Sequence, residues 1–437
     1  MPNTLAHWPD LAGIEAAAAL LKGQIIRTPC LAAPRLSALT GADCVVKFEN
    51  MQVTGSFKER GAYVKMSRLD GEARKKGVIA MSAGNHAQAV AYHAQRLGIP
   101  ATIVMPEATP QVKVENTARF GAEVILKGET LAESQAEVER LIAERGLVLV
   151  HPYDDPDIVA GQGTIGLEML ADFPDLDCIL VPMGGGGLIS GVALAAKALR
   201  PGIEIVGVEV ASYPSFHNAM TGSSLSIGGP TLAEGIAVKH VGKLTLEIAK
   251  SLVSGPILVP ESAVERAVDA FANHQRSMAE GAGAAGLAAL LHEPQRFRGR
   301  KVGLILCGGN IDARILASIM VRELERKQRI ISFRLTSDDR PGFLGRVATK
   351  LGELGANILE VTHRRTFLSV PARGVSLDVT VETRGEPHAA EIFDALAAEG
   401  LNPQRIDPNG VVMPWAPKPA EPQRGSRLTQ KIDPTQA

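Results

Sequence analysis

The sequence predicts an α/β protein with two lobes built on parallel sheets, followed by a smaller βαββαβ domain at the C-terminus. Between about residues 43 and 310, short apolar runs alternate with Gly-rich turns and amphipathic stretches, which is the pattern of strands buried on both faces of a parallel sheet. After residue 330 the order becomes strand, helix, two strands, helix and strand, which is the split βαβ arrangement. About 300 residues exceed the usual need of one doubly wound sheet, so we expect two lobes that share a cleft.

The first domain is expected over residues 1–322, with its smaller lobe at about 50–150. Eight apolar runs indicate buried strands: Cys44–Phe48, Val78–Met81, Ala101–Met105, Glu123–Leu126, Leu147–Val150, Cys178–Val181, Glu204–Glu209 and Val302–Leu306. The stretches between them indicate helices, among them His86–Leu97, Leu131–Arg145, Leu188–Leu199 and Ser262–Met278. Because strands and helices alternate, we expect right-handed crossovers between parallel strands.

A charged stretch at residues 323–329 is expected to link this domain to a second one at residues 330–408. The expected elements there are Ile330–Thr336, Gly342–Leu354, Asn357–Phe367, Arg373–Glu382, His388–Glu399 and Asn402–Ile406. Residues 409–437 are rich in proline and poor in apolar residues, so we expect a disordered tail.

The overall composition excludes several classes of protein. The 437 residues are 45% hydrophobic and 21% charged, with a formal net charge of −1. This mix is too apolar for general disorder, and its balanced charge gives no general attraction for nucleic acid or an anionic membrane. The sequence shows neither a signal peptide nor an apolar run of about 18 residues, and its four cysteines form no CxxC pair. We therefore expect a cytoplasmic protein with no nucleic-acid or membrane partner.

A lysine lies just after the first strand, in residues 49–62, ENMQVTGSFKERGA. Open α/β sheets place ligands at the carboxyl ends of their strands. Gly55 frees the turn, and Ser56 or Thr54 can cap the helix that follows. Lys58 then lies in the first helical turn, where the helix dipole disfavours its ammonium form. A lysine with a lowered pKa suits Schiff-base chemistry, although a lone lysine in such a turn is more often a solvated surface residue.

A second loop, residues 82–88 with the sequence SAGNHAQ, also follows a strand and opens a helix. Backbone amides and the Ser82 hydroxyl at a helix N-terminus suit the binding of a carboxylate. The alternatives are an ordinary turn residue for Asn85 and a helix-start histidine for His86.

A third loop, GGGGL, lies between a strand and the helix that begins near Leu188. Consecutive glycines let backbone N–H groups converge on an anion, and the spacing matches neither GxxxxGK[ST] nor GxGxxG. The alternative is a flexible loop.

A fourth loop, residues 306–312 with the sequence LCGGNID, follows a strong apolar strand. Taken alone, Cys307 is more simply interpreted as an ordinary cysteine buried in the hydrophobic core.

Together the four loops resemble, in their order, those of the fold-type II (tryptophan synthase β-like) pyridoxal-phosphate enzymes. TGSFKERGA in particular resembles the Schiff-base lysine segment of the threonine and serine dehydratases, and the resemblance covers roughly residues 10–320. It implies pyridoxal 5′-phosphate as the cofactor and an α,β-elimination as the reaction.

The resemblance also implies a role for each motif. Lys58 binds the cofactor and removes the α-proton, Phe57 packs beside the ring, and Cys307 faces the pyridine nitrogen. The glycine loop cradles the phosphate through Gly184, Gly185, Gly186, Gly187 and Leu188. The substrate carboxylate is held by Ser82, Ala83, Gly84, Asn85 and His86. Ser82 is also a candidate catalytic residue, Asn85 hydrogen-bonds the 3′-oxygen of the cofactor, and Glu280 lies close to it.

Two sequence differences from other enzymes of this fold favour a threonine ammonia-lyase. Such an enzyme forms 2-oxobutanoate and ammonia from L-threonine and also acts on L-serine. Serine racemases of this fold carry a second serine where this chain has Ala83. Cysteine synthases have a KDR-type lysine segment and a GTGGT-like loop. The alternatives are an L-serine dehydratase or racemase-like enzyme and, from another class, a non-catalytic amino-acid sensor.

A cation site is doubtful in this chain, so no metal site is predicted. Relatives bind a monovalent or divalent cation through a glutamate that Glu209 matches. The further carboxylate expected about six residues on is Ser215 here, and Glu209 can simply close a strand.

Residues 339–364, DRPGFLGRVATKLGELGANILEVTHR, resemble an ACT domain. ACT domains usually pair side by side and bind amino acids at the interface, with contacts near Gly342, Asn357 and Ile358. The resemblance implies an allosteric enzyme of isoleucine biosynthesis that forms a homo-oligomer, either a dimer or a homotetramer. A dimerisation module without a ligand is the alternative.

Overall fold

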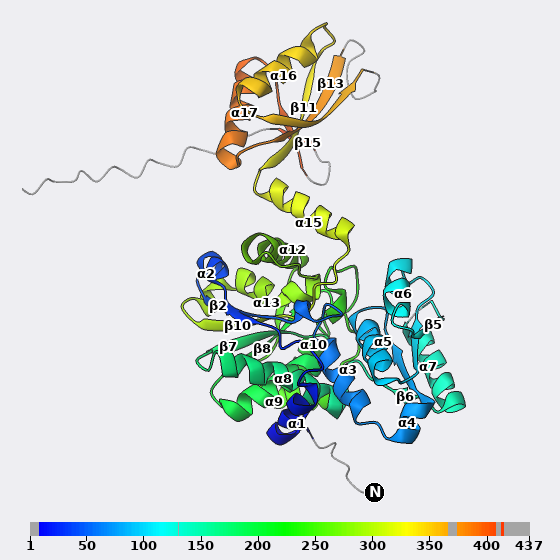
Figure 1. The fold of residues 1–437 in the computed structure, drawn as a ribbon. Coiled ribbons are helices and arrows are strands. Elements are labelled where there is room, and N and C mark those ends of the chain that lie inside the picture. Colours follow the sequence, from blue (N-terminus) through cyan, green and yellow to red (C-terminus); the bar gives the residue numbers. More distant parts are fainter. Residues whose placement is uncertain (1–7, 130, 366–373, 408–411, 415–437) are drawn as a thin grey trace, which may run out of the picture. The chain divides into compact units, whose positions relative to one another are not determined.

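The computed structural model describes residues 8–129, 131–365, 374–407 and 412–414 (Figure 1). The chain folds as two compact units that divide between Ile319 and Met320. Among the described residues, none of the helices has the length and apolar character needed to cross a membrane.

The larger lobe of the first unit is built on a six-stranded sheet in the order β1-β2-β10-β7-β8-β9. Its neighbours pair in parallel, except for the antiparallel edge pair β1–β2. Figure 1 shows α12 and α13 on one face of this sheet and α8 and α9 on the other. The strands are β1 (Cys30–Ala32), β2 (Asp43–Phe48), β7 (Cys178–Pro182), β8 (Glu204–Val210), β9 (Ile257–Val259) and β10 (Lys301–Leu306).

Helices cover both faces because every strand side chain in a parallel sheet must be shielded from water. The helices around this sheet are α1 (Leu11–Leu21), α2 (Pro34–Thr40), α8 (Pro156–Asp172), α9 (Gly187–Leu199), α10 (Ser215–Thr221), α11 (Lys243–Leu252), α12 (Glu261–Ala270), α13 (Gly281–His292) and α14 (Pro294–Phe297). Helix α3 (Lys58–Ser67) packs against α8 and also against the core of the smaller lobe. Short 3₁₀ turns lie at Glu49–Met51 and Glu234–Ile236, and α15 (Ala313–Arg326) follows β10.

The smaller lobe has a four-stranded parallel sheet in the order β5-β4-β3-β6. Its strands are β3 (Val78–Met81), β4 (Ala101–Met105), β5 (Glu123–Leu126) and β6 (Val148–Leu149), and its helices are α4 (Gly71–Lys76), α5 (Asn85–Leu97), α6 (Gln111–Ala118) and α7 (Leu131–Arg145). The predicted two-lobed α/β architecture is therefore confirmed. The domain limits of 1–322 and 330–408 and the lobe limits of 50–150 stay predictions.

Three expectations for individual elements were incomplete. The strands β1 and β9 were missed because three residues are too few to show a period. The expected helix Ser262–Met278 ends at Ala270 and continues as a π-helical turn, Phe271–Gln275. The expected linker 323–329 begins inside α15, so its first residues are helical.

The second unit is a five-stranded antiparallel sheet in the order β12-β13-β11-β14-β15, with two helices. Its core includes the aromatic pair Phe333 and Phe393, whose ring centroids lie 5.5 Å apart. The elements are β11 (Ile330–Asp338), α16 (Phe343–Glu353), β12 (Asn357–Arg364), β13 (Gly374–Glu382), α17 (Glu386–Ala398), β14 (Gln404–Ile406) and β15 (Val412–Pro414).

The βαββαβ prediction is thus confirmed, with one strand added. Strand β15 pairs with β14, which corrects the expectation that disorder begins at residue 409. The remainder of the expected tail, and the predicted strand ends at Phe367 and Arg373, lie outside the described residues.

Candidate active site

The four predicted loops follow strands β2, β3, β7 and β10. Strands β2, β10 and β7 are direct neighbours in the large sheet and run in parallel. Their carboxyl ends therefore lie at one edge, which brings the lysine loop, the LCGGNID loop and the glycine loop together. The SAGNHAQ loop joins them from the smaller lobe.

Lys58 is the first residue of α3, and its side chain is only partly exposed. Its Nζ atom donates a hydrogen bond to the backbone oxygen of Pro152 at 2.7 Å and lies 5.1 Å from the centroid of the Phe57 ring. Burial lowers the pKa of Lys58 to about 8, although the nearby Cys307 and Glu280 oppose the shift. The predicted direction is confirmed, with burial rather than the helix dipole as the largest cause.

The predicted cap of this helix is wrong. Phe57 occupies the cap position and makes no side-chain cap bond, and the hydroxyls of Ser56 and Thr54 have no hydrogen-bond partner among the described residues. Backbone contacts hold the segment instead. The Phe57 N–H donates to the oxygen of Cys307 at 3.0 Å, so the lysine segment is tied directly to the end of β10.

The positions of the glycine loop require glycine because of packing as well as because of the predicted anion site. A Cβ at Gly185 would overlap the ring of Tyr153, and one at Gly186 would lie 2.5 Å from Phe216. Gly186 also has a φ of 92°, and it caps α9. Gly187 and Leu188 begin that helix, and the first N–H groups of a helix have no acceptor within it. The loop therefore presents backbone donors suited to a phosphate.

Contacts within the loop and to the core stabilise the loop that follows β3. The Ser82 hydroxyl accepts a hydrogen bond from the Gly84 N–H at 3.2 Å, and Ala83 packs against the core of the smaller lobe. The buried His86 ring donates to the oxygen of Val150 at 2.7 Å. Burial lowers the pKa of His86 to about 3, so its side chain is a neutral part of the scaffold, and only its backbone is available to a carboxylate.

Asn85 and Glu280 meet across the two lobes. Asn85 opens α5 and donates from Nδ2 to Oε1 of Glu280 at 2.7 Å. Glu280 caps α13, and burial raises its pKa to about 7. Burial also raises the pKa of the Cys307 thiol well above its usual range. At neutral pH Cys307 is therefore an uncharged thiol.

Asn310 was missed by sequence reasoning, although it lies within LCGGNID. Its Nδ2 atom donates to Oδ1 of Asn85 and to the oxygen of Thr54, both at 2.8 Å. A polar side chain directly after the paired glycines was the available signal.

A buried cluster of charges beneath the lysine helix was also missed. The side chains of Arg60, Lys47 and Glu49 are fully buried. Arg60 pairs with Glu49 at 2.7 Å and with Glu168 at 2.8 Å, and Lys47 pairs with Glu168 at 2.5 Å. Burial opposes the charge of Glu49, but the Arg60 guanidinium lowers its pKa overall. The cluster joins α3 to β2 and α8, and a lysine inside the apolar run CVVKF was its signal in the sequence.

Glu209 connects the end of strand β8 to the start of helix α10. It accepts backbone hydrogen bonds from Phe216 at 2.7 Å and His217 at 2.8 Å, in the first turn of α10. Burial raises its pKa to about 7. The described residues contain no group of three or more His, Cys, Asp or Glu side chains placed to hold a metal ion.

The predicted effector contacts lie at the two ends of α16. Gly342 caps the start of this helix, whereas Asn357 and Ile358 begin β12, after the helix has ended. Eleven residues of helix span about 16 Å at 1.5 Å per residue. One chain therefore does not bring these predicted contacts together.

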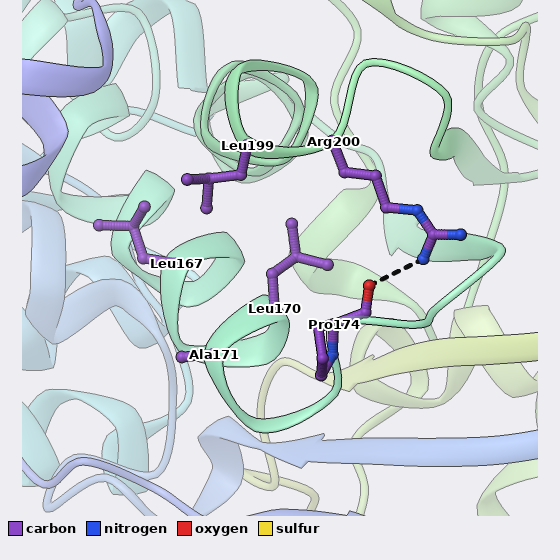
Figure 2. A pocket seen from close by; sticks show the side chains of 6 residues that line it. All are labelled: Leu167, Leu170, Ala171, Pro174, Leu199 and Arg200. Atoms are coloured by element: carbon purple, nitrogen blue, oxygen red, sulfur yellow. Dashed lines mark hydrogen bonds between the residues drawn. The ribbon is translucent and has the colours of Figure 1, made fainter.

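An apolar hollow of about 310 Å³ lies elsewhere on the first unit (Figure 2). It is lined by Leu167, Leu170, Ala171, Pro174, Leu199 and Arg200. Leu199 is the last residue of α9, about 20 Å along that helix from the glycine loop. The hollow therefore does not belong to the candidate site.

Known proteins match both units. The family described as pyridoxal-phosphate dependent enzyme matches residues 21–308, and the ACT domain matches residues 331–402. An L-threonine ammonia-lyase from Thermotoga maritima is 42% identical over 392 residues, which cover 89% of this chain and 98% of that protein. Among solved structures, maize serine racemase has a TM-score of 0.68 at 35% identity and covers 74% of this chain and 100% of its own. Threonine deaminase isoform 2 from Solanum lycopersicum has a TM-score of 0.67 at 36% identity, covering 71% and 86%.

Proposed function

The chain belongs to the pyridoxal-phosphate dependent enzyme family and carries a C-terminal ACT domain, and from this premise we propose that it is a threonine ammonia-lyase. It converts L-threonine to 2-oxobutanoate and ammonia, and it also acts on L-serine. The observation that carries the proposal is the 42% identity to an L-threonine ammonia-lyase over 392 residues, which cover 89% of this chain and 98% of that protein.

The residues present fit pyridoxal phosphate. The glycine loop offers first-turn amides to the phosphate, and the partly buried Lys58 has a lowered pKa. The hydroxyls of Ser56 and Thr54 beside Lys58 are buried without partners among the described residues, which suits a polar ligand. When bound, the cofactor supplies an electron-accepting ring that stabilises negative charge at the substrate Cα.

The roles of the side chains follow from their protonation. With a pKa of about 8, Lys58 is a free amine in part of the molecules at neutral pH, so Nζ can hold the cofactor and then accept the α-proton. The uncharged Cys307 thiol adds no negative charge at its position. Ser82 and the backbone from Ala83 to His86 orient the substrate carboxylate, and Asn85 donates to the cofactor 3′-oxygen.

The direct test is a coupled 2-oxo acid assay on the full chain with L-threonine and with L-serine. We expect ammonia and 2-oxobutanoate from threonine, with a higher kcat/KM than for serine. A serine rate far above the threonine rate would overturn the substrate assignment, and effector binding without turnover would identify a non-catalytic sensor.

Serine racemisation is the second candidate function, favoured by the structural likeness to maize serine racemase. Ala83 opposes it, because a methyl group cannot donate or accept a proton at the opposite face of the substrate. Chiral chromatography after incubation with L-serine distinguishes the two, and we expect pyruvate without D-serine.

We also propose amino-acid regulation through the ACT unit of a homo-oligomer, either a dimer or a tetramer, in the cytoplasm. The separation of the predicted effector contacts along α16 supports a site completed by a second chain, and the four free, buried cysteines suit a reducing compartment. We expect isoleucine to lower the rate and valine to oppose it. Sedimentation equilibrium measures the assembly, and an unchanged saturation curve with isoleucine would refute this regulation.

A further inference from the structure

Asn310 lies where three loops of the candidate site meet. It follows β10 in the chain, and its side-chain amide reaches both Thr54 in the lysine loop and Asn85 at the start of α5. These partners are 256 and 225 residues away in the sequence. The side chain therefore joins segments that only the folded protein brings together.

One backbone carbonyl sets the direction of the whole hydrogen-bond chain. The Thr54 carbonyl can only accept, so the amide group of Asn310 that faces it must be the NH₂ group. That NH₂ group also lies 2.8 Å from the side chain of Asn85, where a second NH₂ group would be repelled, so the atom of Asn85 that faces it is the acceptor Oδ1. The NH₂ group of Asn85 consequently faces Glu280, at 2.7 Å.

The bond to Glu280 uses one of the two amide hydrogens of Asn85. The second hydrogen is left for a ligand oxygen in the site. If the Asn85 amide were rotated by half a turn, an oxygen would occupy that place and would repel an electron-rich ligand atom.

Packing keeps Asn310 in place. A Cβ at Gly55 would lie 2.5 Å from Oδ1 of Asn310, so the amide lies close against the Gly55 turn. The Gly309 N–H also donates to the oxygen of Gly55 at 3.0 Å. The Asn310 side chain is exposed, so water competes for its bonds, and a moderate rather than a large effect is expected from its loss.

We propose that Asn310 is a positioning residue that fixes the amide orientation of Asn85, so that Asn85 presents a hydrogen-bond donor to the hydroxyl oxygen of bound pyridoxal phosphate. The inference rests on the proposed function, since it takes that cofactor as the ligand. Asn310 itself acts only through Asn85.

The test measures the affinity of the cofactor-free full chain for pyridoxal phosphate by fluorescence titration. Asn310→Asp keeps the shape of the side chain but removes both donors. We expect its Kd to rise by about three- to tenfold, the scale of one hydrogen bond, together with a shifted absorption maximum of the bound cofactor.

Asn50→Asp is the matched control. Asn50 donates from Nδ2 to the oxygen of Met278 at 3.0 Å, two residues before Glu280, but the structure records no bond from it to Asn85. We expect its Kd and absorption maximum to match those of the unmodified chain. An equal loss of affinity in both variants would overturn the proposal, because it would indicate general loosening of the junction.

The decisive comparison repeats the Asn310 change in an Asn85→Ala background. If Asn310 acts through Asn85, the second change adds no further loss of affinity. A full additional loss would refute the positioning role, as would an unchanged Kd in Asn310→Asp alone. Should that variant not fold, Asn310→Ala is held to the same criteria. Failure of the unmodified chain to bind pyridoxal phosphate would instead refute the proposed function.

Discussion

Lys58 donates a hydrogen bond from Nζ to the backbone oxygen of Pro152, a residue 94 positions away in the sequence. The next residue, Tyr153, lies against the backbone of Gly185 and Gly187 in the glycine loop. The reactive amine is therefore tied through two consecutive residues to the loop proposed to hold the cofactor phosphate.

The pH dependence of cofactor binding follows from the pKa of Lys58. Only the free amine reacts, and its pKa is about 8. We expect the rate at which cofactor-free protein binds pyridoxal phosphate to rise with pH through that value and then to level off, as followed by stopped-flow absorbance. Lys65→Ala on the same helix, where Lys65 pairs with Asp155 at 2.7 Å, should keep this profile, whereas Lys58→Ala should abolish covalent binding. A rate that does not change with pH would contradict the assignment.

Gly185→Ala should damage both stability and cofactor affinity, because the added Cβ overlaps the Tyr153 ring. Forcing extra atoms into a packed site costs about 1–3 kcal/mol of the free energy of unfolding. Urea unfolding and fluorescence titration with pyridoxal phosphate measure the two effects. Gly202→Ala adds the same group where nothing lies within 4 Å and should change neither quantity. Normal stability and affinity in Gly185→Ala would show that the loop can move aside.

Arg60→Leu should destabilise the first unit strongly. It removes the partner of two carboxylates, Glu49 and Glu168, the first of which is fully buried. Breaking a buried ion pair by removing one partner costs about 3–5 kcal/mol of the free energy of unfolding, measurable by urea denaturation. Arg140, which pairs with Glu137 and Glu144 on the surface, provides the control, and Arg140→Leu should leave the urea midpoint unchanged. Equal midpoints for both variants would contradict a structural role of the cluster.

Glu280 should make the cofactor-free protein less stable as the pH rises. Burial raises its pKa from 4.5 to about 7, so the folded chain binds this proton more tightly than the unfolded chain. Stability is therefore lost progressively between pH 4.5 and about 7. Glu280→Gln removes this titration and should lose less Tm than the unmodified chain over the same interval. The exposed Glu72 serves as the control, because Glu72→Gln should follow the unmodified chain. Identical Tm profiles for Glu280→Gln and the unmodified chain would show that Glu280 does not carry this effect.

Local patterns were sufficient for most of the fold. The bounds of β3, β4 and β5 were predicted to the residue, because each apolar run ends near turn-forming residues such as Gly77, Pro100 and Pro106. The side chains of β3 and β4 are largely buried, whereas those of the edge strand β5 are half-buried or exposed. The motif order and the carboxyl-end rule likewise placed Lys58, Asn85, the glycine loop and Cys307 at one edge of the sheets. Strand bounds and the order of the loops depend on residues that are close in the sequence, so they can be predicted from the sequence alone.

Contacts between distant segments depended on folding. The residues near Asn310 in the chain do not predict that its amide donates a hydrogen bond to Asn85. They also do not predict that Asn85 donates a hydrogen bond to Glu280, 195 residues away. The shift of the Lys58 pKa arises mainly from burial, and desolvation is a property of the surrounding packing rather than of the lysine segment. The sequence therefore identified the chemical groups and the order of their loops, whereas the folded chain set their protonation and their partners, because both depend on which atoms exclude water around them.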